Sequence, residues 1–324
     1  MTHTLLQVEN LHISFNTPHG DSHTLRGVDF AVAPGSIFGI VGESGCGKSL
    51  TGKAILGLVP HPGRVTDGRI VFDDQDLREM GDRARRSLLG NQIGMIFQDP
   101  SAALNPVFTI EQQMMMVMQR HRKESKRALR IRAVELIDDV GLPNPERILR
   151  SYPHELSGGM QQRVMIAMSL SLDARLLIAD EPTTALDVTI QAQILDLLVK
   201  LRSEKGVAII LITHDMGVVA ETCDEMAVFY AGRVVEIGSA ENIFNDPKHP
   251  YTQGLLAALP HTSSRGHDLK VIPGSVPSGF DRSPGCAFAD RCEHVMEHCR
   301  QSPPPFTTFS NGHKALCHLY MDEE

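Results

Sequence analysis

Residues 42–49 read Gly-Glu-Ser-Gly-Cys-Gly-Lys-Ser and match the phosphate-binding pattern G-x-x-x-x-G-K-[ST]. They lie between an apolar run at 37–41 and a helical pattern from Leu50 to Leu56, which is the context that this pattern requires. The glycines let backbone N–H groups close around phosphate oxygens, and the helix directs its positive end at them. We expect Lys48 to reach the β and γ phosphates of a nucleotide, and the Ser49 hydroxyl to bind Mg²⁺. The binding residues expected here are Gly42, Glu43, Ser44, Gly45, Cys46, Gly47, Lys48, Ser49 and Leu50.

Four further polar side chains follow predicted strands. Asp180 and Glu181 end the apolar run 176–180, Gln98 follows the run 92–97, and His214 follows the run 207–212. Ligands of parallel sheets bind at these carboxyl ends of strands. We expect Asp180 to hold Mg²⁺ together with Ser49 and Gln98, and Glu181 to polarise an attacking water. The sequence therefore predicts hydrolysis of a nucleoside triphosphate.

Cys46 stands inside the phosphate loop and supports two hypotheses. Its neighbour Lys48 and the helix start both favour the thiolate, so alkylation would block activity. Alternatively, Cys46 occupies a variable loop position and its thiol is unremarkable.

The elements that must position these residues alternate between short apolar strands and helices. Strands are predicted at 5–15, 26–32, 37–41, 69–75, 92–97, 176–180 and 207–212, and a helical region at about 109–172. Such alternation specifies an α/β fold with a parallel sheet. We expect one domain at 1–259 and a Pro/Gly-rich extension at 260–324 that has little capacity for a core of its own.

Composition narrows the class of protein. The chain has 31 basic and 39 acidic residues in 324, a formal charge of −8, so we expect no nucleic-acid partner. The start MTHTLLQVENLHISF has no basic leader followed by an apolar stretch. Apolar runs also fall short of the roughly 18 residues that span a bilayer. We expect the chain to stay in the cytosol.

The stretch Leu156-Ser157-Gly158-Gly159-Met160-Gln161-Gln162-Arg163 carries a family resemblance. Together with the phosphate loop, Gln98, Asp180-Glu181 and His214, in that family's order, it resembles the signature of ABC-type ATPases over residues 5–260. The resemblance implies a cassette with a parallel-sheet core, an antiparallel β subdomain and an α-helical signature subdomain. It also implies ATP as the substrate, and the expected catalytic residues are Glu181, His214 and Gln98.

Further residue roles follow from the same resemblance. Ser157, Gly158 and Gly159 would contact ATP held by a partner cassette. The segment Ala185-Leu186-Asp187 matches the loop that crosses the dimer seam, and Phe15 falls where an aromatic ring stacks on adenine. Met160 departs from the glutamine that is more usual at the last signature position.

Other short segments narrow the resemblance. Ile96-Phe97-Gln98-Asp99-Pro100, Leu104-Asn105-Pro106, Tyr152-Pro153-His154 and His249-Pro250-Tyr251-Thr252-Gln253 resemble the ATP-binding subunits of bacterial dipeptide and oligopeptide importers, with the dipeptide type closest. The implied partners are a second cassette, identical or a paralogue, two membrane permeases and, indirectly, an extracytoplasmic peptide-binding protein. The implied place is the cytoplasmic face of the inner membrane.

Two rival functions stay open at this point. One is a soluble ABC ATPase acting on DNA or ribosomes, although only about a hundred residues separate Lys48 from Ser157 and the chain has one cassette. The other is an importer subunit for nickel or another small solute.

Four cysteines, Cys286, Cys292, Cys299 and Cys317, crowd the end of the chain. Their segment is poor in apolar residues, so we expect an inorganic staple. Four thiolates suit either a [4Fe–4S] cluster or zinc, and the wide spacing favours the cluster. A tail of reduced, unligated thiols is the alternative.

Overall fold

The computed structural model describes residues 4–172, 174–184, 186–259, 272–277 and 284–321. The chain divides into two compact units. Unit 1 holds residues 1–78 and 212–324, and unit 2 holds residues 79–211. The domain boundary expected near residue 260 falls at the start of residues 260–271, outside the described residues, and stays a prediction.

Unit 1 contains an antiparallel sheet that begins the chain. Its strands are β1 (Leu6–Thr17), β2 (Gly20–Val32), β4 (Gly63–Phe72) and β5 (Gln75–Asp76), in the order β2-β1-β4-β5. The strand expected at 69–75 is therefore wrong in its limits. Asp73 and Asp74 adopt positive φ values of 50° and 62°, and they turn the chain into β5, a conformation that Asp tolerates.

A second set of strands in unit 1 carries the phosphate loop. It consists of β3 (Ile37–Val41), β9 (Glu225–Tyr230), β10 (Arg233–Ser239), β11 (Phe306–Thr308) and β12 (Lys314–Leu316), in the order β11-β12-β10-β9-β3. β3 pairs in parallel with β9, while β10 pairs antiparallel with both β9 and β12. All five residues of β3 are buried, which explains its continuous apolar sequence.

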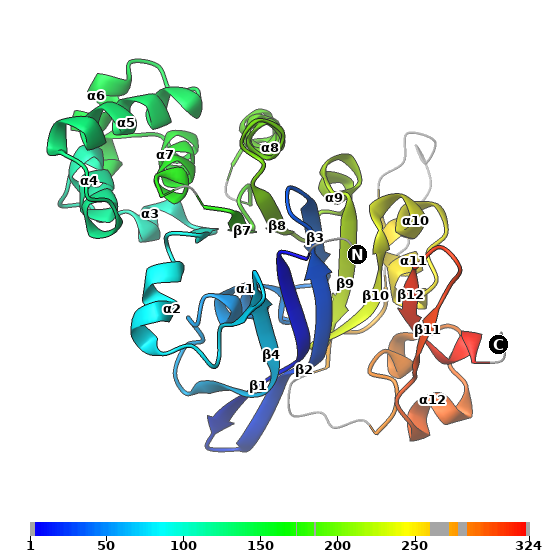
Figure 1. Cartoon of the computed structure of the whole chain (residues 1–324). Helices are drawn as coiled ribbons and strands as arrows, with labels where there is room; N and C mark the ends of the chain where they lie inside the picture. The colour runs from blue at the N-terminus through cyan, green and yellow to red at the C-terminus, as the bar shows by residue number, and fades with distance from the viewer. Residues whose placement is uncertain (1–3, 173, 185, 260–271, 278–283, 322–324) are drawn as a thin grey trace. The chain divides into compact units, whose positions relative to one another are not determined.

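Five helices and two 3₁₀ turns complete unit 1 in its described residues. They are α1 (Lys48–Ile55), α9 (Met216–Thr222), α10 (Ala240–Asn245), α11 (Pro250–Ala257), α12 (Glu297–Gln301), η3 (Ala289–Arg291) and η4 (His318–Tyr320). A buried hydrophobic cluster joins these strands to the C-terminal tail, whose described residues are 284–321. In this cluster Tyr230 of β9 and Tyr251 of α11 both contact Phe288 of the tail. The tail, orange to red in Figure 1, also adds β12 to the edge of β10.

Unit 2 combines three strands with a group of helices. Its strands are β6 (Ile93–Ile96), β7 (Leu176–Asp180) and β8 (Ala208–Ile212), in the order β8-β7-β6, and every strand residue is buried. Its helices are α2 (Asp82–Leu88), α3 (Pro100–Ala103), α4 (Ile110–His121), α5 (Lys126–Asp139), α6 (Pro145–Arg150), η1 (Pro153–Glu155), α7 (Gly158–Leu170) and α8 (Val188–Lys205). Helices α4, α5 and α6 pack together, and α7 packs on α5 (Figure 1).

The expected fold class agrees with these units. The sequence predicted β3 and β7 with the limits that the structure has, and it predicted β6 and β8 within one residue at each end. A parallel pair, β6 with β7, lies in unit 2 with helices α2 to α8, and the antiparallel sheet β2-β1-β4-β5 lies in unit 1. Among the described residues, no helix is long and apolar enough to cross a membrane.

Candidate nucleotide site

The phosphate loop connects β3 to α1 inside unit 1. Lys48 is 4% exposed, and its Nζ donates to the carbonyl oxygens of Gly42 at 2.7 Å and of Glu43 at 3.0 Å. The first two residues of the loop therefore hold the side chain of Lys48 in place through their carbonyl oxygens. Ser49 and Leu50 lie in the first turn of α1, and Ser44 and Gly45 are exposed. Backbone N–H groups at such a helix start bind anions.

Glycine is required at two loop positions for steric reasons. Gly42 has a φ of 146°, and a Cβ there would lie 2.2 Å from the carbonyl oxygen of Phe229. Gly47 caps α1 with a φ of 103°, and its Cβ would lie 2.4 Å from Cδ2 of Leu25. The glycine spacing thus fits the loop against β9 and β2, both in unit 1.

Cys46 is fully buried at 0% exposure, and burial raises the pKa of its thiol, while Lys48 opposes this only in part. This burial disfavours the hypothesis of a reactive thiolate, because desolvation favours the neutral form. The structure supports the alternative of an unremarkable thiol.

Two further predicted residues lie in unit 1. Phe15 of β1 is half-buried, and its ring packs against Gly63, where a Cβ would lie 2.6 Å from Cε1 of Phe15. His214 is exposed and lies two residues after the end of β8. The preceding residue, Thr213, donates its backbone N–H to Ile40 of β3 at 3.1 Å. This bond fixes the point from which His214 projects.

The predicted carboxylates lie together with Gln98 in unit 2. Asp180 ends β7 and is 4% exposed, and Glu181 follows with a φ of 47°. Oε2 of Glu181 accepts hydrogen bonds from Nε2 of Gln98 and from the Thr184 hydroxyl, each at 2.9 Å. The left-handed backbone turns Glu181 off the strand, and the two donors fix its carboxylate.

The signature segment forms the start of α7, also in unit 2. The Ser157 hydroxyl caps this helix by accepting from the Met160 N–H at 3.4 Å, and both Ser157 and Gly158 are exposed. A Cβ at Gly159 would lie 2.8 Å from Cγ2 of Ile190 in α8, so only glycine fits there. Asp187 caps α8 by accepting from the Ile190 N–H at 3.0 Å. Ala185 lies outside the described residues.

The sequence alone did not indicate several contacts of Glu43 in unit 1 and of Glu181 in unit 2. The Tyr251 hydroxyl accepts from the backbone N–H of Glu43, Arg291 forms an ion pair with the Glu43 carboxylate, and Thr184 binds Glu181. Tyr251 stands in one of the importer-like segments, which was a signal of family but not of a site. No local sequence pattern indicated the contact between Arg291 and Glu43, because 248 positions separate the two residues.

The donor set expected for Mg²⁺ has suitable chemistry. Ser49 supplies a hydroxyl, Gln98 an amide oxygen and Asp180 a carboxylate, and Mg²⁺ prefers such oxygen donors. Magnesium sites that handle nucleotides usually take one or two carboxylates plus phosphates and waters. One aspartate in the set is therefore enough.

The expected iron–sulfur or zinc centre in the tail is wrong. Among the described residues, which include all four tail cysteines, no group of three or more His, Cys, Asp or Glu side chains could hold a metal ion. The cysteines are free, and burial raises the pKa values of Cys286, Cys292 and Cys317. Without a metal ion, burial thus favours the neutral form of these thiols.

The premise behind that expectation also fails in the structure. The expectation assumed that the tail needs a metal centre to fold, but its apolar side chains pack into the hydrophobic core of unit 1. Phe288 is 3% exposed against Tyr230 and Tyr251, and β12 extends the sheet at β10. In addition, Nε2 of His313 lies 2.7 Å from Oε1 of Glu236, and both of these side chains are fully buried.

Two family models match this chain. The model described as ABC transporter matches residues 25–184, and the one described as the C-terminal region of oligopeptide/dipeptide transporters matches residues 235–299.

Three curated relatives are similar over nearly the whole chain. The dipeptide transport ATP-binding protein DppD of Bacillus subtilis is 48% identical over 316 residues, covering 97% of this chain and 94% of that protein. DppD of Escherichia coli is 44% identical over 319 residues, covering 98% of each. The oligopeptide transport ATP-binding protein OppD of Salmonella typhimurium is 45% identical over 319 residues, covering 98% of this chain and 95% of that protein.

Two solved structures share the fold. The ATP-binding cassette MJ0796, solved as a dimer in a post-hydrolysis state with ADP and Pi, has a TM-score of 0.65 and 26% identity, covering 72% of this chain and 98% of that one. The protein cbiO1 of Clostridium perfringens, part of the ABC transporter complex cbiONQ, has a TM-score of 0.65 and 30% identity. The match covers 75% of this chain and 91% of that one.

Proposed function

The chain belongs to the family of ATP-binding subunits of dipeptide and oligopeptide ABC transporters, and we propose that it hydrolyses ATP to drive the import of such peptides. This membership confirms the resemblance derived from the phosphate loop and the signature. The relatives reported above are all named for peptide transport, which favours an importer over an ABC protein acting on DNA or ribosomes.

The observation that best supports peptides as the cargo is the match of residues 235–299 to the C-terminal region of oligopeptide/dipeptide transporters. This region includes Tyr251, Phe288 and Arg291, the residues that join the tail to β9 and to the phosphate loop. The part of the chain that distinguishes peptide transporters is thus built into the nucleotide-binding unit.

The chemistry of ATP hydrolysis is assigned to named residues. Lys48 and the N–H groups of residues 42–49 bind the β and γ phosphates, and Phe15 stacks on adenine. Ser49, Asp180 and Gln98 would hold Mg²⁺, which would neutralise phosphate charge when bound. Glu181 orients the attacking water, and the hydrogen bonds from Gln98 and Thr184 support this role because they fix its carboxylate. His214 completes the catalytic set.

A second cassette completes each ATP site in this proposal. Ser157, Gly158 and Gly159 contact ATP bound by the partner cassette, and the exposure of Ser157 and Gly158 at the start of α7 supports this role. Asp187, exposed at the start of α8, lies at the seam. ATP favours the closed dimer because only there does it gain the second set of contacts. We assign the partner cassette to a paralogue.

The membrane partners are two permease subunits, which the chain joins at the cytoplasmic face of the inner membrane. Three exposed apolar side chains in unit 2 support their docking, because Phe97 is 38%, Val107 69% and Phe108 37% exposed. Among the nearby methionines, Met114 and Met118 are fully buried, whereas Met116 is 51% exposed. A peptide-binding protein outside the membrane delivers the cargo.

Reconstitution tests the function. The chain, its partner cassette and two permeases are placed in proteoliposomes, and ATP hydrolysis and solute uptake are measured with the binding protein present. We expect dipeptides or short oligopeptides to stimulate both, and nickel to stimulate neither. Uptake of nickel without peptide uptake would reassign the cargo, and the absence of ATP hydrolysis would refute the proposal.

A further inference from the structure

Glu43, the second residue of the phosphate loop, is held by residues far along the chain in the same unit. Nη1 of Arg291 donates to Oε2 of Glu43 at 2.7 Å, and Nη2 donates to Oε1 at 2.9 Å. The backbone N–H of Glu43 donates to the Tyr251 hydroxyl at 2.9 Å. Both the backbone and the side chain of Glu43 are therefore fixed by the C-terminal part of unit 1.

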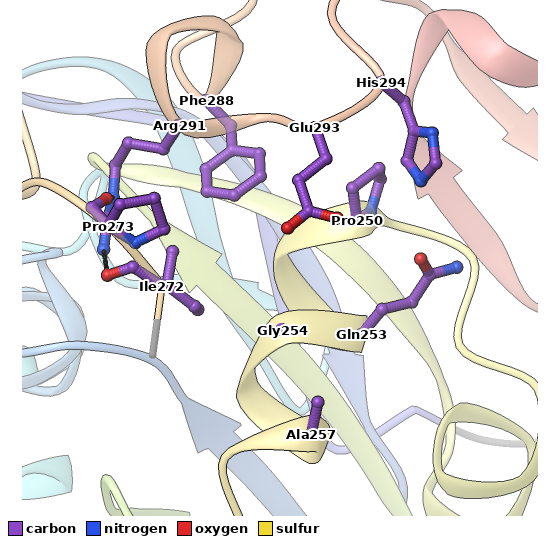
Figure 2. Close-up of a pocket in the computed structure, with 10 residues that line it drawn as sticks. All are labelled: Pro250, Gln253, Gly254, Ala257, Ile272, Pro273, Phe288, Arg291, Glu293 and His294. Atoms are coloured by element: carbon purple, nitrogen blue, oxygen red, sulfur yellow. Dashed lines mark hydrogen bonds between the residues drawn. The ribbon is translucent and has the colours of Figure 1, made fainter. Parts of the chain in front are cut away.

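Arg291 is itself held in one orientation. Its side chain is 6% exposed, and Nε donates to the Pro273 carbonyl at 2.7 Å. The guanidinium carbon lies 5.7 Å from the ring centre of Tyr230 and 5.9 Å from that of Phe288. Figure 2 shows Arg291 beside Pro273 and Ile272 at one wall of a cavity of ≈ 210 Å³. A two-pronged ion pair with such a fixed cation is strong and directional.

The charge of Glu43 gives this ion pair a consequence for the bound anion. A carboxylate in a phosphate-binding loop opposes a polyphosphate, because like charges at short range repel strongly in a partly buried site. Arg291 cancels that charge with a guanidinium that is permanently protonated. The carboxylate is only partly shielded without it, since the Glu43 side chain is 32% exposed.

The position of the Glu43 backbone also matters for Lys48. Nζ of Lys48 donates to the Glu43 carbonyl at 3.0 Å and to the Gly42 carbonyl at 2.7 Å. Any shift of Glu43 therefore shifts the acceptors that orient the lysine. The tail thus reaches the phosphate-binding lysine through a single intermediate residue.

We propose that Arg291 is a positioning residue of the nucleotide site, which neutralises Glu43 and holds the loop that orients Lys48. The inference rests on the proposed ATP-binding function. It makes the C-terminal region a part of the nucleotide site, in addition to its match with peptide transporters.

The test is a double-mutant cycle on the full-length chain, with the Kd for Mg·ATP measured by calorimetry. We expect Arg291→Gln to raise the Kd about tenfold, because Glu43 is then unpaired. Glu43→Gln should raise the Kd less than Arg291→Gln does, because its amide carries no charge to repel the phosphates, and the double variant should bind ATP about as well as Glu43→Gln and more tightly than Arg291→Gln. A purely structural role for Arg291 predicts no such rescue, since removal of the Glu43 charge would not repair the tail.

Matched variants and kinetics complete the design. Arg300→Gln removes a comparable ion pair with Asp290 in the same tail, on exposed side chains, and should leave the Kd unchanged. Arg291→Lys keeps the charge but loses the fork, so its Kd should lie between those of wild type and Arg291→Gln. In the assembled transporter, Arg291→Gln should raise the KM for ATP and leave kcat within about twofold.

Three outcomes would overturn the inference. These are a wild-type Kd in Arg291→Gln, a double variant as weak as Arg291→Gln, and an equal loss of affinity in Arg300→Gln. Wild-type protein that binds no ATP would instead refute the proposed function on which the inference rests.

Discussion

Gln98 donates a hydrogen bond from Nε2 to Oε2 of Glu181 at 2.9 Å, although 83 positions separate the two residues. The same oxygen accepts from the Thr184 hydroxyl at 2.9 Å. Gln98 follows β6 and Glu181 follows β7, two strands that pair in parallel, so their carboxyl ends meet at one edge. This edge carries the residues to which we assign the hydrolytic step.

Replacement of Glu181 by Gln should retain ATP binding and reduce steady-state turnover at least about a hundredfold. The amide keeps the size and polarity of the side chain, but it removes the carboxylate that orients water. ATPase assays in the assembled transporter, with nucleotide binding measured in parallel, check this result, and ATP-trapped dimers should accumulate. Glu204→Gln is the control, because Glu204 is an exposed partner of Lys200 in the same unit. Wild-type turnover in Glu181→Gln would remove Glu181 from catalysis.

Replacement of Gln98 by Ala should reduce kcat about tenfold, because the Glu181 carboxylate is then no longer held by that amide. Nucleotide affinity should change less, because the loop at residues 42–49 is intact. Thr184→Val removes the other donor, and a smaller loss in that variant would identify Gln98 as the main contact. The contrary result is a kcat for Gln98→Ala that equals wild type.

The sequence allowed much of this site to be predicted because its signals are local. The phosphate loop, Asp180-Glu181 and the signature each combine a short motif with a neighbouring strand or helix. Burial makes β3 and β7 continuous apolar runs, and these have the predicted limits. Parallel strands also place Gln98 beside Glu181, which follows from the rule on strand ends.

The tail could not be predicted in the same way. Two of its polar contacts are made with residues more than seventy positions away, Glu236 with His313 and Glu43 with Arg291. An apolar-poor segment suggested a metal staple, yet Phe288 and β12 join it to a core formed elsewhere in unit 1. The spacing of the four cysteines in the sequence gives no information on how Phe288 and β12 pack against the rest of unit 1.

Cys46 should not be the site at which alkylation inhibits the enzyme. The thiol is fully buried, and burial raises its pKa, so the reactive thiolate is scarce at neutral pH. We expect brief iodoacetamide treatment at pH 7 to leave ATPase activity of wild type and Cys46→Ser equal. Mass spectrometry of the treated protein gives the modified positions. Rapid inhibition of wild type, with protection by ATP and resistance in Cys46→Ser, would contradict this prediction.

His249 provides a link between pH and stability in unit 1. The ring is 1% exposed, Nδ1 accepts from the Tyr251 N–H at 3.1 Å, and the residue caps α11. Burial lowers the pKa of His249 to about 4, while the negative charge of Glu236 opposes this shift. The folded state therefore keeps the neutral ring that accepts the hydrogen bond.

The folded pKa of His249 is lower than the unfolded value of 6.5, so the unfolded chain takes up a proton first as the pH falls. The stabilisation is complete above pH 6.5 and is lost as the pH falls from 6.5 towards 4, with about 2 kcal/mol lost between pH 7 and pH 5. His249→Asn keeps a capping side chain but cannot titrate. Urea unfolding at the two pH values should therefore show a smaller pH-dependent loss in His249→Asn than in wild type. His19→Asn, at an exposed position, should behave as wild type. Equal losses in wild type and His249→Asn would show that the protonation of His249 does not set this dependence.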